Sequence, residues 1–151
     1  MTEQQQTGDL VITRMFDAPR ELVWKAFTDP DQLAAWFGPV GWSVPRDTVS
    51  VDTRPGGHQR FTMVNDADPT ETSPVRATFT EVVEPELRVL PLLLAGQQLG
   101  PTTMRMRLEF HDEGGKTRLV LRQGPYTPDI EKMAREGWGS SFTKLDALLA
   151  R

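Results

Sequence analysis

Few residues of this chain have side chains suited to acid–base, nucleophilic or metal chemistry, and they are scattered. The 151 residues contain no cysteine and two histidines, His58 beside a glycine turn and His111 at the end of a polar strand face. A histidine metal site would therefore need several carboxylates, and the spacings match no familiar ligand pattern. The motifs G-x-S-x-G, H-E-x-x-H and G-x-x-x-x-G-K do not occur. The sequence thus predicts no catalytic residue, no metal and no cofactor.

Two charged residues fall where strand alternation can turn them inward, and both are candidate polar anchors for a ligand. Arg14 lies on the same alternation as Phe16, so it points inward if Phe16 is core. There it can bind a ligand carboxylate or pair with a buried acid such as Asp52, and structural pairing is the favoured alternative. Glu81 shares the alternation of Phe79 and is either a pocket acid or part of a solvated strand end.

The N-terminal part of the chain predicts one strand followed by two short helices. Residues 10–16 have the pattern of a strand covered on both faces. Pro19 supplies a helix start, and a second helix begins at Asp29-Pro30, with Asp29 as its N-cap, and runs to Trp36. Residues 1–8 are expected to form a flexible tail. Residues 9–151 are expected to form one domain, since 38% hydrophobic and 25% charged residues are ordinary values for a single soluble domain.

The middle of the chain reads as strands and turns. The expected strands span roughly 43–53, 57–64, 75–83, 86–94, 102–112 and 116–123. Glycine turns at 55–57 and 112–115 indicate hairpins. The clearest alternation runs from 104 to 111, and it places apolar residues on one face and polar residues on the other. Pro91 suggests an edge position or a bulge in its strand.

A long amphipathic helix is predicted from 128 to 151. Its apolar or small residues recur at i, i+3, i+4 and i+7, so one face is expected to cover the sheet. Gly137 lies on this face although a mid-helix glycine costs about 1 kcal/mol relative to alanine. Two interpretations carry equal weight. Either the helix approaches the sheet closely at Gly137, or the glycine leaves space beside Trp138 for a cavity, next to the small Ser141.

These segments together resemble a known family. The stretches FDAPRELVWKAFTDPDQLAAWFGP, VDTRPGG, TFTEVVEPELRV, TRLVLRQ and GWGSSFTKLDALLA are similar to bacterial relatives of the C-terminal domain of the activator of heat-shock-protein ATPase. That family belongs to the START-like, birch-pollen-allergen-like helix-grip superfamily. The resemblance implies an α+β fold, in which a curved antiparallel sheet of about seven strands packs on a long C-terminal helix and encloses an apolar cavity.

For the cavity that the resemblance implies, the family match, strand alternation and helical spacing together give a set of candidate lining residues. They are Trp36, Phe37, Gln59, Phe61, Met63, Phe79, Met104, Met106, Leu108, Met133, Gly137, Trp138 and Phe142. The alternative for most of the large apolar members is an ordinary core. After the double glycine at 56–57, relatives tend to have a basic and then an aromatic residue, where this chain has His58 and Gln59. If its strand face lines the cavity, Gln59 can fix a polar ligand group. The segment 36–39 is a candidate lid over the cavity mouth.

Three functions follow from this picture. The first is a cytoplasmic binding module for a hydrophobic or aromatic small molecule. The second is a co-chaperone-like stress-response module that binds a chaperone, and the third is a polyketide-cyclase-like enzyme. A net charge of -4 without a basic run argues against nucleic acid, and no apolar run reaches membrane-spanning length. The polar N-terminus, without signal-peptide features, indicates the cytoplasm.

Overall fold

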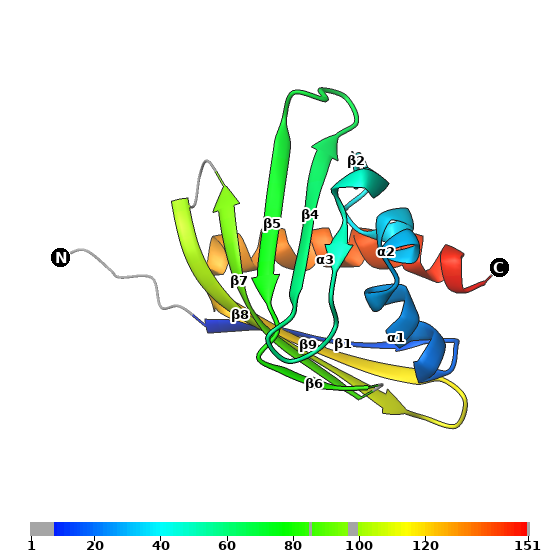
Figure 1. Ribbon diagram of the computed structural model, residues 1–151. Helices are drawn as coiled ribbons and strands as arrows, with labels where there is room; N and C mark the ends of the chain where they lie inside the picture. The colour runs from blue at the N-terminus through cyan, green and yellow to red at the C-terminus, as the bar shows by residue number, and fades with distance from the viewer. Residues whose placement is uncertain (1–7, 85, 97–99, 151) are drawn as a thin grey trace.

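The strands form one antiparallel sheet, and the C-terminal helix lies across its face (Figure 1). The computed structural model describes residues 8–84, 86–96 and 100–150, with side chains except at 87–96 and 100–104. The elements are β1 (Gly8–Phe16), α1 (Arg20–Thr28), α2 (Pro30–Trp36), β2 (Trp42–Ser43), the 3-10 turn η1 (Arg46–Thr48), β3 (Ser50–Val51), β4 (His58–Asn65), β5 (Thr72–Thr78), β6 (Glu81–Val83), β7 (Leu87–Gly96), β8 (Gly100–Asp112), β9 (Thr117–Tyr126) and α3 (Pro128–Leu149). The strand order is β1-β9-β8-β7-β5-β4-β2, with β3 paired to β4 and β6 paired to β7.

This arrangement confirms the α+β class and the order of strand, two short helices, further strands and long helix. The sheet has nine strands where about seven were expected, because two predicted strands are interrupted. Pro45 and the turn η1 divide the segment 43–53. The segment 75–83 breaks at Phe79, whose backbone N–H donates to the carbonyl of Gly57 and whose carbonyl accepts from the N–H of Gly56. The backbone of Phe79 is thus bonded to the glycine turn.

Local signals set the helix boundaries. The Asp29 side chain accepts hydrogen bonds from the backbone N–H groups of Asp31 at 2.9 Å and Gln32 at 3.5 Å, which confirms it as the N-cap of α2. α3 begins at Pro128, where the missing N–H of proline does no harm. The tail expected at 1–8 lies outside the described residues except for Gly8, which begins β1.

Pro91 lies in an interior strand, so the expected edge position is wrong. β7 pairs with β6 through residues 87–89 and with β5 through residues 92–94. Pro91 falls between these two partners, while its register with β8 continues through Arg105 without a bulge. Proline has no backbone N–H to donate. Pro91 occupies a position of β7 that has no partner residue in β5 or β6.

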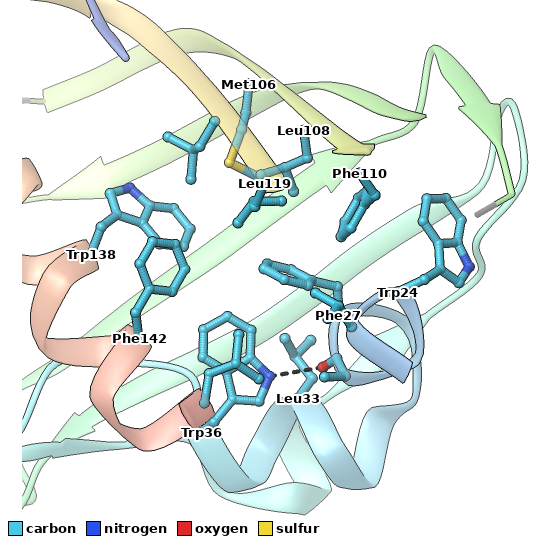
Figure 2. Close-up of a cluster of buried hydrophobic side chains, with 14 of the residues drawn as sticks. Trp24, Phe27, Leu33, Trp36, Met106, Leu108, Phe110, Leu119, Trp138 and Phe142 are labelled. Atoms are coloured by element: carbon cyan, nitrogen blue, oxygen red, sulfur yellow. Dashed lines mark hydrogen bonds between the residues drawn. The ribbon is translucent and has the colours of Figure 1, made fainter. Parts of the chain in front are cut away.

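An aromatic cluster fills part of the space between the sheet and the helices (Figure 2). Phe27 contacts Trp36 edge-on at 4.8 Å and Phe110 of β8 at 5.4 Å between ring centroids, geometries that aromatic pairs favour. The indole N–H of Trp36 donates to the carbonyl of Ala26 at 2.8 Å, so this buried polar group is satisfied. Phe142 of α3 closes the cluster against Trp36. α1 and α2 thus seal one part of the inward face of the sheet.

Candidate ligand pocket

A pocket of about 160 Å³ lies between the middle of α3 and the remaining part of the inward sheet face. β4, β5, β8, β9, α3 and the connection between α2 and β2 all contribute to it. Its described lining residues are Phe37, Gly38, Pro39, Gln59, Phe61, Met63, Val75, Met106, Gln123, Tyr126, Ala134, Gly137, Trp138 and Ser141. A mostly apolar concave surface with a few polar groups is the usual composition of a small-molecule site.

The helical wall of the pocket is built from small residues around one tryptophan. Ala134, Gly137, Trp138 and Ser141 are spaced i, i+3, i+4 and i+7, so they share one face of α3. A side-chain carbon built at Gly137 would meet no atom within 4 Å. The glycine therefore borders open space, and close packing of the helix on the sheet does not explain it.

The sheet wall follows the two-residue repeat of β4. Gln59, Phe61 and Met63 point to the same face, and Phe61 lies opposite Val75 of β5. Met106 of β8 lies opposite Gln123 of β9 and continues this wall. The alternation recognised in the sequence therefore brings these side chains together.

Four of the described lining residues have polar side chains that are almost completely buried. Gln59 is 3% exposed, Gln123 4%, Ser141 3% and Tyr126 7%. The indole N–H of Trp138 donates to Oε1 of Gln123 at 2.9 Å, which joins the helical wall to β9. Burial raises the pKa of the Tyr126 hydroxyl to about 12, because the phenolate would lose its hydration. The described lining residues include no charged side chain.

The connection between α2 and β2 covers one side of the pocket. The ring of Phe37 contacts Phe61 at 4.6 Å and Trp138 at 5.5 Å between centroids, so it bridges sheet and helix. Two bonds tie the segment after it to α3. The backbone N–H of Val40 donates to Oγ of Ser140 at 2.7 Å, and Nζ of Lys144 donates to the carbonyl of Trp42 at 3.1 Å. The candidate lid is therefore anchored to the same helix that forms the pocket wall.

Several residues expected at the cavity lie in the sealed core. They are Trp36, Phe79, Leu108 and Phe142, each buried to 1% exposure or less. Leu108 has the same inward orientation as Met106, but its neighbour on that face, Phe110, is covered by Trp24 and Phe27 of α1. The side chain of Met104 lies outside the described residues.

Met133 lies on the outer surface of α3 and is 60% exposed, so its assignment to the cavity is wrong. At 3.6 residues per turn it stands about 140° around the helix from Trp138. Gly137 is half-buried at the border of the inward face, and Met133 lies about 40° further around the helix on the exposed side.

Neither candidate anchor reaches the pocket. Arg14 forms a bidentate pair with Asp146 of α3 at 2.8 and 2.6 Å, and its guanidinium lies over the rings of Phe16 and Phe142. Its partner is thus Asp146 and not Asp52, and the hydrogen bond with Asp146 raises the pKa of Arg14. Glu81 is exposed on β6, which agrees with a solvated strand end.

Apart from the lid residues Gly38 and Pro39, five described lining residues were not among the sequence candidates for the cavity: the apolar Val75 and Ala134 and the polar Gln123, Tyr126 and Ser141. Gln123 had a usable signal, because it continues the inward alternation of Leu119 and Leu121 with a long polar side chain. Tyr126 lies beyond the predicted end of its strand, which β9 extends to residue 126. Ser141 was noted only as a small residue of the helix face.

Other kinds of site find no support in the part of the chain that the structure describes. No three histidine, aspartate or glutamate side chains there are grouped to hold a metal ion. Among the same residues, no helix is both long and apolar enough to cross a bilayer.

Comparison with protein families gives one match across most of the chain. Residues 17–150 match the family described as activator of Hsp90 ATPase homolog 1-like protein. The chain belongs to this family. No curated protein matches the sequence.

Solved structures of similar proteins agree with the family assignment. A protein from Nitrosomonas europaea is 28% identical with a TM-score of 0.77, and the match covers 94% of each chain. The AHSA1 protein from Silicibacter pomeroyi is 27% identical with a TM-score of 0.79, over 95% of this chain and 98% of that one. A protein from Chromobacterium violaceum has a TM-score of 0.82 at 24% identity, over 95% and 97% of the two chains, and supports the fold alone.

Proposed function

We propose that this family member is a cytoplasmic binding module for a hydrophobic or aromatic small molecule, held in the pocket between α3 and the sheet. The observation that carries the proposal is the open space at Gly137. Gly137 is half-buried and lines the pocket, and a Cβ atom built on it would have no neighbour within 4 Å. Native interiors are close-packed, so unfilled space lined by aromatic and methionine side chains favours a guest molecule.

The chemistry of the lining fits such a guest. Phe37, Phe61 and Trp138 offer ring faces and edges, and Met63 and Met106 offer flexible, polarisable surface that adapts to varied apolar shapes. An apolar cavity of about 150 Å³ is large enough for a benzene-sized ring. The pocket volume of about 160 Å³ is therefore sufficient for one aromatic ring.

Native mass spectrometry of the protein purified from its own source tests this function. The expected result is a discrete added mass that is lost on denaturation. If the purified protein is empty, incubation with fatty acids, flavonoids and polyketide-like aromatics should produce one. The Gly137→Leu variant, with its pocket filled, should take up nothing, whereas Gly139→Leu on the exposed side of the same helix should behave like the wild type.

A wild-type protein that stays empty against the whole panel would refute the proposal. That outcome would favour the alternative of an interaction module that binds a chaperone. Turnover of a bound aromatic compound would instead favour the cyclase-like enzyme.

A further inference from the structure

We propose that the pocket selects an uncharged aromatic molecule that carries a hydrogen-bond-accepting oxygen, of which an aryl ketone is the simplest case. This inference rests on the proposed function and adds the chemical class of the ligand. It is argued from buried hydrogen-bonding groups that have no partner within the described part of the chain.

The first of these groups is the amide nitrogen of Gln123. An indole N–H can only donate, so the bond from Trp138 at 2.9 Å must be accepted by Oε1 of the amide. This bond fixes the amide orientation and leaves the NH₂ group of Gln123 as a donor. Among the described residues this NH₂ group has no acceptor, although the side chain is 4% exposed.

Two hydroxyl groups add to this donor. Tyr126 and Ser141 both line the pocket, and neither hydroxyl forms a hydrogen bond within the described part of the chain. Tyr126 follows Gln123 by three residues at the end of β9, and Ser141 lies one turn beyond Trp138 on α3. A buried polar group without a partner is costly, and water can satisfy these groups only while the pocket is empty of ligand. A ligand that displaces this water must supply an acceptor or lose affinity.

The absence of charge in the lining determines what kind of acceptor fits. A carboxylate moved into the pocket would lose its hydration, and the described lining residues offer no cation to compensate. Arg14 is bound to Asp146, and Lys144 donates to the carbonyl of Trp42, so neither cation is directed to the pocket. A neutral carbonyl accepts the same hydrogen bonds at a much smaller desolvation cost. The rings of the lining then contact the aromatic part of the ligand.

Isothermal titration calorimetry with three probes of similar size tests the inference. Propiophenone and propylbenzene differ only by a carbonyl in place of a methylene group, and 3-phenylpropanoate carries a carboxylate. A carbonyl oxygen can accept two hydrogen bonds, and two such bonds predict at least tenfold tighter binding of propiophenone than of propylbenzene. 3-Phenylpropanoate should bind the weakest of the three.

The possible results separate this inference from the proposed function. Equal affinity for propiophenone and propylbenzene within twofold would overturn the ligand class and leave the binding function intact. Tightest binding of 3-phenylpropanoate would also overturn the ligand class alone. Failure of all three probes to bind would refute both proposals.

Substitutions on the pocket wall provide a second test. The double variant Tyr126→Phe/Ser141→Ala should lower the preference for propiophenone at least threefold and leave the affinity for propylbenzene within twofold of wild type. Thr143→Ala removes an exposed hydroxyl from the same helix and serves as the matched control. An unchanged preference in a double variant that still melts cooperatively would overturn the assignment. Ser141→Ala alone replaces the double variant if the latter does not fold.

Discussion

Leucine at position 137 is expected to stabilise the protein while it blocks the pocket. Gly137 is helical and borders open space, so a Cβ atom there would meet nothing within 4 Å. Gly139 also lies inside α3 with nothing within 4 Å, but on the exposed side of the helix. The two glycines therefore form a matched pair in which only one substitution fills the pocket.

The expected magnitudes follow from two contributions. Replacing a mid-helix glycine by leucine gains roughly 0.8 kcal/mol of helix propensity at either position. At position 137 the leucine side chain also leaves water for an apolar pocket, which contributes about 1.5–3 kcal/mol, less about 0.5–1 kcal/mol of lost rotamer freedom. Gly137→Leu should therefore raise the free energy of unfolding by about 1.3–3.3 kcal/mol, and Gly139→Leu by about 0.8 kcal/mol.

Urea denaturation followed by tryptophan fluorescence measures both values, with an unchanged m-value as the check that the two-state comparison holds. A loss of about 1–3 kcal/mol in Gly137→Leu, with Gly139→Leu stabilised, would indicate overpacking. That result would show that α3 lies too close to the sheet at Gly137 to leave usable space, and it would refute the reasoning.

Three further predictions concern groups around the pocket and core. Tyr126 is the only tyrosine, so tyrosinate absorbance should give a midpoint near the pKa of about 12 in the folded protein and near 10 in urea. Between pH 10 and 12 the folded state keeps the Tyr126 proton that the unfolded state has lost, so the free energy of unfolding should fall by about 1.4 kcal/mol per pH unit. A folded midpoint near 10 would contradict the burial of the hydroxyl. Asp146→Asn should cost about 1 kcal/mol or less in urea denaturation, because the side chains of Arg14 and Asp146 are 31% and 46% exposed, and a loss above 3 kcal/mol would be inconsistent with so exposed a pair. Trp36→Phe should cost about 1–3 kcal/mol in the same assay, because it removes the donor to Ala26 and leaves a gap in the core, and an unchanged midpoint would count against that bond.

The parts of the fold that local sequence patterns determine were predictable. The N-cap at Asp29, the alternation through Met106 and Phe110, and the helical spacing of α3 depend on neighbours a few residues away. The break at Phe79 was not visible, because it depends on backbone bonds to a turn more than twenty residues earlier in the chain. Pairing of Arg14 with Asp146 joins residues 132 positions apart, and no local pattern identifies that partner.

The pocket itself was predictable only in part, for a related reason. Alternation shows that Met106 and Leu108 point inward. It cannot show that α1 packs on one region of the sheet, whereas a pocket separates the middle of α3 from another region. That division decides which inward residues belong to a sealed core and which line a pocket. The polar members Gln123 and Tyr126 became meaningful only once their strand was placed opposite Trp138.

The central claim is an accessible apolar pocket beside Trp138, and nuclear magnetic resonance of the indole N–H groups with benzene tests it most directly. Trp138 lines the pocket, whereas Trp24 extends from α1 and packs against Phe110 in the core. We predict that benzene shifts the indole resonance of Trp138 in a saturable manner and leaves that of Trp24 in place, and that Gly137→Leu abolishes the shift. An unperturbed Trp138 resonance at saturating benzene would contradict the account.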